Sequence, residues 1–143
     1  MENKPISEIL LEQRVRNNII EHFELASSEE KLIEYQNNVP IAVAPNELIA
    51  GWYDEFWISE YNKGGYNYPV FTEEERKTLL TYNTLMDEIN KEIPNDIWDI
   101  NDVFKLPFWK KLKNESEIAL SIFMKRGLFS DDIEMEKVKK RQY

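Results

Sequence analysis

Residues 7–26 read SEILLEQRVRNNIIEHFELA, and their apolar side chains recur at the spacing of one helix face. The members of this stripe are Leu11, Val15, Ile19, Ile20 and Phe23. Such spacing is typical of an amphipathic helix that packs against a core. Ser7 stands where its hydroxyl can cap the first turn. The sequence therefore predicts one long helix near the start of the chain.

Two further helices are predicted after the first, with an extended segment between them. Ser27 and Glu30 match a capping box that would open a second helix directly after the first. Residues 39–45, VPIAVAP, are bracketed by prolines, so we expect them to be extended and buried. Residues 46–61 return to helical spacing and predict a third helix. The expected core positions of the two helices are Leu32, Ile33, Tyr35, Leu48, Ile49, Trp52 and Phe56, together with Tyr53 or Trp57.

The second half of the chain predicts further helices. Thr72 and Glu75 form another capping box and open a fourth helix. Its expected core residues are Leu79, Leu80, Leu85, Met86 and Ile89. Residues 101–105 predict at most a one-turn helix. Pro107 suits the first position of a longer helix, which would end before Gly127.

These patterns predict an all-α fold, a single compact bundle of five to six helices over residues 1–143. Residues 63–69, KGGYNYP, predict a Gly/Tyr-rich loop with at least one position at positive φ. Residues 130–143 place acids before bases, which suits a helix, but their few apolar residues are typical of a frayed tail. On the second interpretation, deleting this segment should leave the fold intact.

Charge is distributed unevenly along the chain. The formal net charge is −9, yet residues 27–100 alone carry 15 acids and 5 bases. Nucleic acid would be repelled by such a segment, whereas a basic protein would be attracted to it. The chain has no cysteine, so we expect a reducing compartment, namely a bacterial cytoplasm. We expect no secretory signal and no membrane span, because charged residues interrupt every apolar run.

Residues that could carry chemistry are few. The four glycines cannot assemble a nucleotide-binding loop, and a lone histidine cannot build a two-histidine metal site. His22 lies in the middle of the first predicted helix, and we expect it on the helix surface. Asp54 with Glu55, or Asp96 with Asp99, could form a general acid and base pair, but no motif supports either pair. We expect that the protein is not an enzyme and that it has no cofactor and no metal site.

The most unusual stretch is WYDEFWISEYNKGGYNYPVF, residues 52–71, which mixes aromatic side chains with acids. Some of its aromatics fall at helical core spacing, but its tyrosines stand beside carboxylates and glycines. Tyrosines among acids can receive lysine and arginine side chains through cation–π contacts and charge-assisted hydrogen bonds. We therefore predict a surface for a basic protein partner, made by Asp54, Glu55, Glu60, Tyr61, Tyr66 and Tyr68.

Residues 14–56, from RVRNNIIEHF to ELIAGWYDEF, resemble a stretch found in small bacterial proteins. In size, acidity and lack of cysteine the chain resembles immunity proteins of toxin–immunity systems. This resemblance implies cytoplasmic neutralisation of a toxin domain, often a basic nuclease, by covering its active site. Immunity proteins share a task more than a sequence, so no role is assigned to an individual residue. The alternative is a regulatory or scaffold protein that pairs with itself or with another helical protein.

Overall fold

The computed structural model describes residues 7–38, 44–56, 66, 68–92 and 100–135. These residues form helices and contain no strand, which confirms the predicted all-α class. The described helices are α1 (Glu8–Ala26), α2 (Glu29–Asn38), α3 (Ala44–Phe56), α4 (Glu73–Glu92), α5 (Ile100–Phe104) and α6 (Pro107–Phe123).

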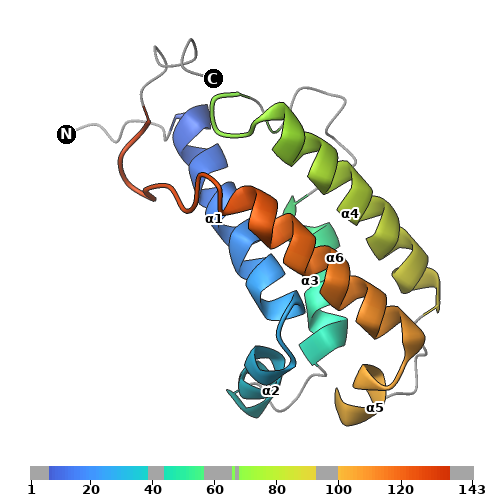
Figure 1. Cartoon of the computed structure of the whole chain (residues 1–143). Coiled ribbons are helices and arrows are strands. Elements are labelled where there is room, and N and C mark those ends of the chain that lie inside the picture. The colour runs from blue at the N-terminus through green and yellow to red at the C-terminus, as the bar shows by residue number, and fades with distance from the viewer. Residues whose placement is uncertain (1–6, 39–43, 57–65, 67, 93–99, 136–143) are drawn as a thin grey trace.

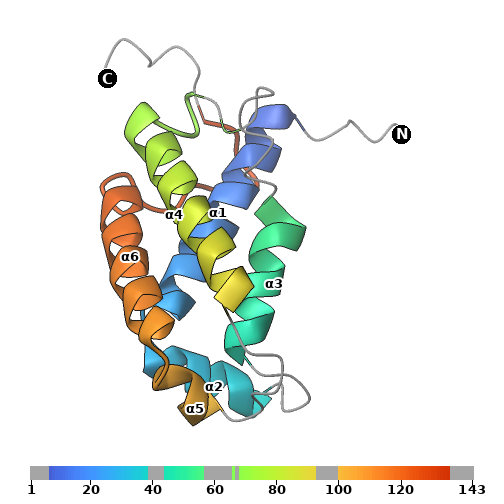
Figure 2. The same cartoon turned by 90° about the vertical axis from the view of Figure 1, so that its right-hand side faces the viewer.

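The long helices pack side by side around one core. α6 contacts both α1 and α4, while α3 covers the side of α1 away from α6 (Figures 1 and 2). The short helices α2 and α5 touch each other and lie together at one end of the bundle (Figures 1 and 2). The arrangement leaves α1, α2 and α3 in mutual contact at that end.

The predicted helix boundaries depend on local capping, and most are confirmed. Ser7 accepts a hydrogen bond from the backbone N–H of Leu10 at 3.1 Å. Thr72 and Glu75 exchange reciprocal bonds of 2.9 and 3.1 Å between their side chains and backbone N–H groups. Pro107 occupies the first position of α6. These groups satisfy amides that would otherwise lack a partner in the first turn.

Two predicted boundaries were wrong. The residue that caps α2 is Ser28, whose hydroxyl accepts from the backbone N–H of Lys31 at 3.1 Å, whereas Ser27 ends α1. α3 begins at Ala44, so the end of the segment expected to be extended is helical. Pro45 does not prevent this, because a proline in the first turn needs no intrahelical N–H partner. Residues 39–43 lie outside the described part of the chain.

The core confirms most predicted positions and corrects several. Its buried apolar residues form one cluster, which includes Ile19, Ile20, Phe23, Leu32, Leu48, Ile49, Trp52, Phe56, Leu79, Tyr82, Leu85, Met86, Ile89, Trp109 and Phe123. Leu11 and Leu80, both expected in the core, are 46% and 37% exposed, and Ile33 and Tyr35 are also exposed. Tyr82 is buried and was missed, because a tyrosine between polar neighbours does not stand out in the apolar pattern.

The N-terminal half of α1 turns a polar face inward, which explains the exposure of Leu11. Arg16 is 0% exposed, and its Nη1 donates to Oε1 of Glu75 at 2.7 Å. Its other N–H groups reach the backbone oxygens of Val70, Phe123 and Gly127 at 3.0–3.1 Å. We call Arg16 and Glu75, with these three carbonyls, the Arg16 cluster. A buried charge is tolerated when it is paired and hydrogen-bonded in this way.

The segment after α6 runs back along α1 (Figure 1). Gln13 donates to the backbone oxygens of Ser130 and Ile133 at 2.8 and 2.9 Å, and accepts from the N–H of Met135 at 2.8 Å. Asn17 bonds both backbone groups of Phe129. Residues 130–135 are therefore neither helical nor frayed, and residues 136–143 lie outside the described part.

Candidate binding site: an acidic pocket between α1, α2 and α3

The predicted partner surface is described only in part. Glu60 and Tyr61 lie outside the described residues. Asp54 and Glu55 belong to the last turn of α3, but their side chains are likewise outside the description. The predicted contact of these four residues with a partner remains a prediction.

The two described tyrosines of that surface differ in setting. Tyr66 is half-buried and packs against the core, with its ring 5.1 Å from that of Phe71. Its φ of 60° gives the loop the predicted position at positive φ. Burial, reinforced by the charge of Glu12, raises the pKa of the Tyr66 hydroxyl well above its usual range. Tyr68 is 36% exposed. The structure thus gives Tyr66 a packing role, and Tyr68 alone of this pair has the exposure expected of a contact residue.

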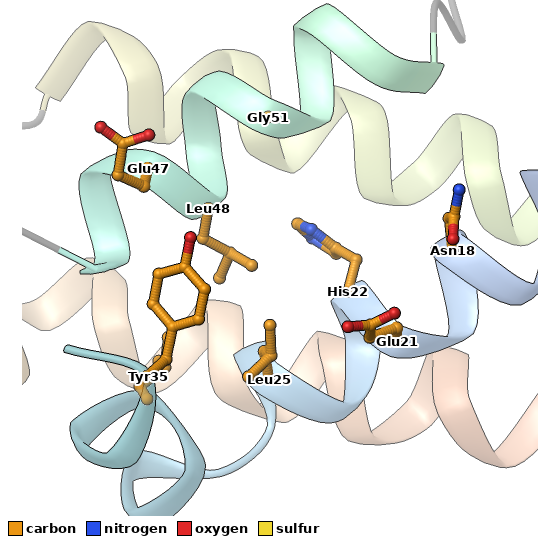
Figure 3. A pocket seen from close by; sticks show the side chains of 9 residues that line it. Asn18, Glu21, His22, Leu25, Tyr35, Glu47, Leu48 and Gly51 are labelled. Carbon is orange, nitrogen blue, oxygen red and sulfur yellow. The ribbon is translucent and has the colours of Figure 1, made fainter. Parts of the chain in front are cut away.

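A pocket of about 300 Å³ opens between α1, α2 and α3 (Figure 3). Its volume lies at the small end of the range for ligand sites. The lining residues are Asn18, Glu21, His22, Leu25, Leu32, Tyr35, Glu47, Leu48 and Gly51. Figure 3 shows Leu25, Leu48 and the Tyr35 ring around the opening, with Glu21 beside His22 and Glu47 above Tyr35. The pocket therefore combines an apolar wall with carboxylates from two different helices.

The acids of this pocket are not neutralised. Glu21 and Glu47 are exposed and form no ion pair or hydrogen bond with the residues that the structure describes. Acids elsewhere in the described bundle do find cations, such as Glu74 with Lys125 at 3.0 Å and Glu88 with Lys111 at 3.6 Å. Residues 21–56 contain eight acids and a single base, Lys31, and so carry a formal charge of −7. This part of the molecule attracts cations.

His22 is in the wall of this pocket, and the prediction of a surface histidine was wrong. It is 6% exposed, because the rings of Phe23, Trp52, Phe56 and Tyr82 surround it with centroids 4.8–6.0 Å away. Burial lowers the pKa of His22 from 6.5 to about 3, so the imidazole is neutral at pH 7. His22 therefore faces the core from α1, which the apolar pattern alone did not indicate.

A chain of buried polar groups starts at His22. Its Nε2 lies 2.9 Å from the hydroxyl of Tyr82, which lies 2.8 Å from the hydroxyl of Ser116. Burial raises the pKa of Tyr82 above its usual range, although the bond to Ser116 opposes this. Three residues from α1, α4 and α6 are thus joined in the core. Nε2 of His22 and the two hydroxyls satisfy one another, and a structural role for this hydrogen-bonded chain follows.

Searches for related proteins give no further guide to the site, since no family model, curated protein or solved structure matches the chain. Within the described residues, no three or more histidine, aspartate or glutamate side chains are grouped so that they could hold a metal ion. None of the described helices combines the length and the apolar character needed to cross a membrane.

Proposed function

We propose that this chain is an acidic protein-binding module, and that it acts as an immunity protein in a bacterial cytoplasm. On this proposal it neutralises a basic toxin domain by direct binding, without catalysing a reaction. The observation that carries the proposal is the open pocket between α1, α2 and α3, where Glu21 and Glu47 have no cation among the described residues, in a stretch of formal charge −7. A surface of this kind steers a basic partner towards itself and discriminates against acidic ones.

The predicted acids on α3 extend this proposal. Asp54 and Glu55 follow Glu47 on the same helix, and the helix ends at Phe56. Glu60, Tyr61 and Tyr68 come soon after in the sequence. We propose that these five residues also contribute to binding the partner. Tyr66 is left out, because its ring packs against Phe71.

Growth rescue tests this proposal. The gene adjacent to the coding sequence of this chain would be expressed with and without the chain, using its C-terminal domain if the product is large. We expect the domain to arrest growth alone, and growth to resume when the chain is present. A stoichiometric complex of the two purified proteins should accompany the rescue. A neighbouring product that is harmless, or that this chain neither binds nor neutralises, would contradict the immunity role.

A second candidate function rests on a different surface, the groove between α4 and α6. Its volume is about 280 Å³, and its lining includes Thr78, Thr81, Ile118 and Ile122. Ile118 lines the groove and is 54% exposed, so a large apolar side chain faces open space there. This surface favours a scaffold role in which the chain pairs with a second copy through α4 and α6. Sedimentation equilibrium of the Ile118→Lys variant tests it: a dimer that becomes monomeric would support pairing, and a wild-type monomer would exclude it.

A further inference from the structure

We propose that the pocket between α1, α2 and α3 receives one arginine side chain of the protein partner. The inference rests on the proposed function and deepens it, because it names the chemical group that the acidic surface would hold. The guanidinium would lie between Glu21, Glu47 and the ring of His22, and its aliphatic stem would pack on the apolar wall. The pocket would then be the anchor point of the interface.

The first step is the apolar wall. Leu32 and Leu48 are buried, Leu25 is half-buried, and the three side chains come from three helices. Figure 3 shows Leu25 and Leu48 facing the opening from α1 and α3, with the Tyr35 ring beside them. A long basic side chain buries its methylene groups on such a wall while its charged end meets polar groups. A simple acidic surface without this wall would bind only the charge.

The second step is a nitrogen atom without a partner. Nε2 of His22 is bonded to Tyr82, whereas Nδ1 forms no hydrogen bond with the described residues. His22 lines the pocket and is 6% exposed, so part of its ring borders this open space. A side chain that is more than nine-tenths buried thus lines the pocket and has one ring nitrogen without a hydrogen-bond partner among the described residues.

The third step is the protonation state of that atom. Both hydroxyls of the chain from His22 to Ser116 can act as donor or acceptor. When Nε2 carries the proton and donates to Tyr82, Nδ1 is a hydrogen-bond acceptor. Because burial keeps the imidazole neutral, it does not repel a cation. In this tautomer the pocket offers acceptors at Glu21, His22 and Glu47, and an arginine supplies only donors.

Arginine fits these acceptors better than lysine does. Glu21 and Glu47 come from different helices and stand on different sides of the opening (Figure 3). A guanidinium spreads five N–H groups over a plane and stacks on aromatic rings such as Tyr35. An ammonium group offers three donors at one point, so it would reach fewer of these acceptors.

The histidine itself provides the test, since His22 is the only one in the chain. The protein would be labelled with ¹⁵N-histidine and titrated with the peptide acetyl-Gly-Arg-Gly-amide. We expect a saturable shift of the Nδ1 resonance, because that nitrogen gains a hydrogen bond, and a much smaller change at Nε2. Matched peptides with citrulline or lysine in place of arginine would be titrated in parallel. An absent shift, or an equal shift with either matched peptide, would overturn the inference.

Variants of the two pocket acids add an independent arm. The Glu21→Gln/Glu47→Gln protein should bind the arginine peptide at least about tenfold more weakly, since two charge-assisted contacts are lost. The matched control is Glu92→Gln/Glu117→Gln, which makes the same charge change at exposed sites on α4 and α6 and should bind as the wild type does. Equal weakening in both variants would show attraction to net charge alone and would contradict a pocket.

The outcome also separates the pocket from the proposed function. If the arginine peptide leaves His22 unchanged while the neighbouring gene product still binds, only the anchor is wrong. If the neighbouring product fails to bind as well, the proposed function fails with it. If the peptide shifts His22 but the neighbouring product does not bind, the pocket stands and the immunity role does not.

Discussion

The Arg16 cluster and the acidic pocket lie less than two turns apart on α1, and they treat charge in opposite ways. In the Arg16 cluster the guanidinium and the Glu75 carboxylate are buried together, and the guanidinium donates to the carboxylate and to three backbone oxygens. In the pocket, Glu21 and Glu47 face open space with no cation among the described residues. The first arrangement fixes the position of α1 against α4 and the segment after α6, whereas the second leaves charge available for a partner.

This difference separates residues that maintain the fold from residues that can bind. Replacing a member of the buried cluster should reduce stability, because the remaining charge would lose its partner inside the protein. Replacing an acid of the pocket should change binding and leave the free energy of unfolding nearly the same. Four variants or conditions test the comparison, in order of decreasing effect.

The largest effect is expected from Arg16→Met. Among the described residues, this change leaves the buried Glu75 with the more distant Arg126 as its ion-pair partner, at 3.5 Å from Nη1, and it removes the donors to three carbonyls. We expect the free energy of unfolding to fall by about 3–5 kcal/mol in urea titrations. The matched control is Arg14→Met on the same helix, where the ion pair with Asp132 is exposed, and a fall of about 1 kcal/mol or less is expected. Equal losses in the two variants would contradict a special role for the buried pair.

The next effect concerns the segment after α6. The structure revises the expectation that residues 130–143 can be removed without consequence, because Gln13 binds three backbone groups of residues 130–135. We expect Gln13→Leu and the truncation at residue 129 each to lower the free energy of unfolding by about 1–3 kcal/mol. In the truncated protein, Gln13→Leu should lower the free energy of unfolding only slightly further. Independent, additive losses would show that Gln13 does not act through this segment.

A smaller effect should follow from pH through His22. Its pKa is about 3 when folded and 6.5 when exposed, so the unfolded chain binds the proton first as pH falls. The free energy of unfolding should therefore decrease between pH 7 and 5.5, by about 1 kcal/mol from this residue alone. The His22→Gln variant cannot take up that proton and should show a smaller decrease over the same range. An identical pH dependence in both proteins would contradict a lowered pKa of His22 in the folded protein.

The smallest change in stability is expected from the pocket acids. Glu21→Gln/Glu47→Gln should unfold within about 0.5 kcal/mol of the wild type, because exposed acids without partners contribute little to folding. Thermal and urea unfolding would measure this difference. A loss above 1 kcal/mol would mean that these carboxylates have a structural role, and the comparison with the Arg16 cluster would then fail.

Local sequence patterns were sufficient to predict the helices. Reciprocal capping at Thr72 and Glu75 and the proline at residue 107 act within one turn, so their effect can be inferred from neighbouring residues. The core was predicted less well where polar side chains point inward. Gln13 and Arg16 are buried because they bind residues more than 50 positions away, and no local pattern shows such contacts.

The pocket was not predicted from the sequence, and most of the predicted surface at residues 54–68 lies outside the described part of the chain. The excess of acids in the middle of the chain pointed to a basic partner, and the pocket has that charge. Its lining, however, is drawn from α1, α2 and α3, and the three helices come together only in the fold. His22 between Glu21 and Phe23 was a signal for this site, but its burial depends on Trp52, Phe56 and Tyr82 from other helices.

The central claim is that the acidic pocket between α1, α2 and α3 helps to capture a basic protein. Association kinetics test this claim most directly. The rate constant for binding the domain encoded by the neighbouring gene would be measured between about 50 and 500 mM salt. We expect it to fall by about tenfold or more over this range, and to be lower for Glu21→Gln/Glu47→Gln than for Glu92→Gln/Glu117→Gln at low salt. A rate constant that is independent of salt and equal in the two variants would contradict the claim.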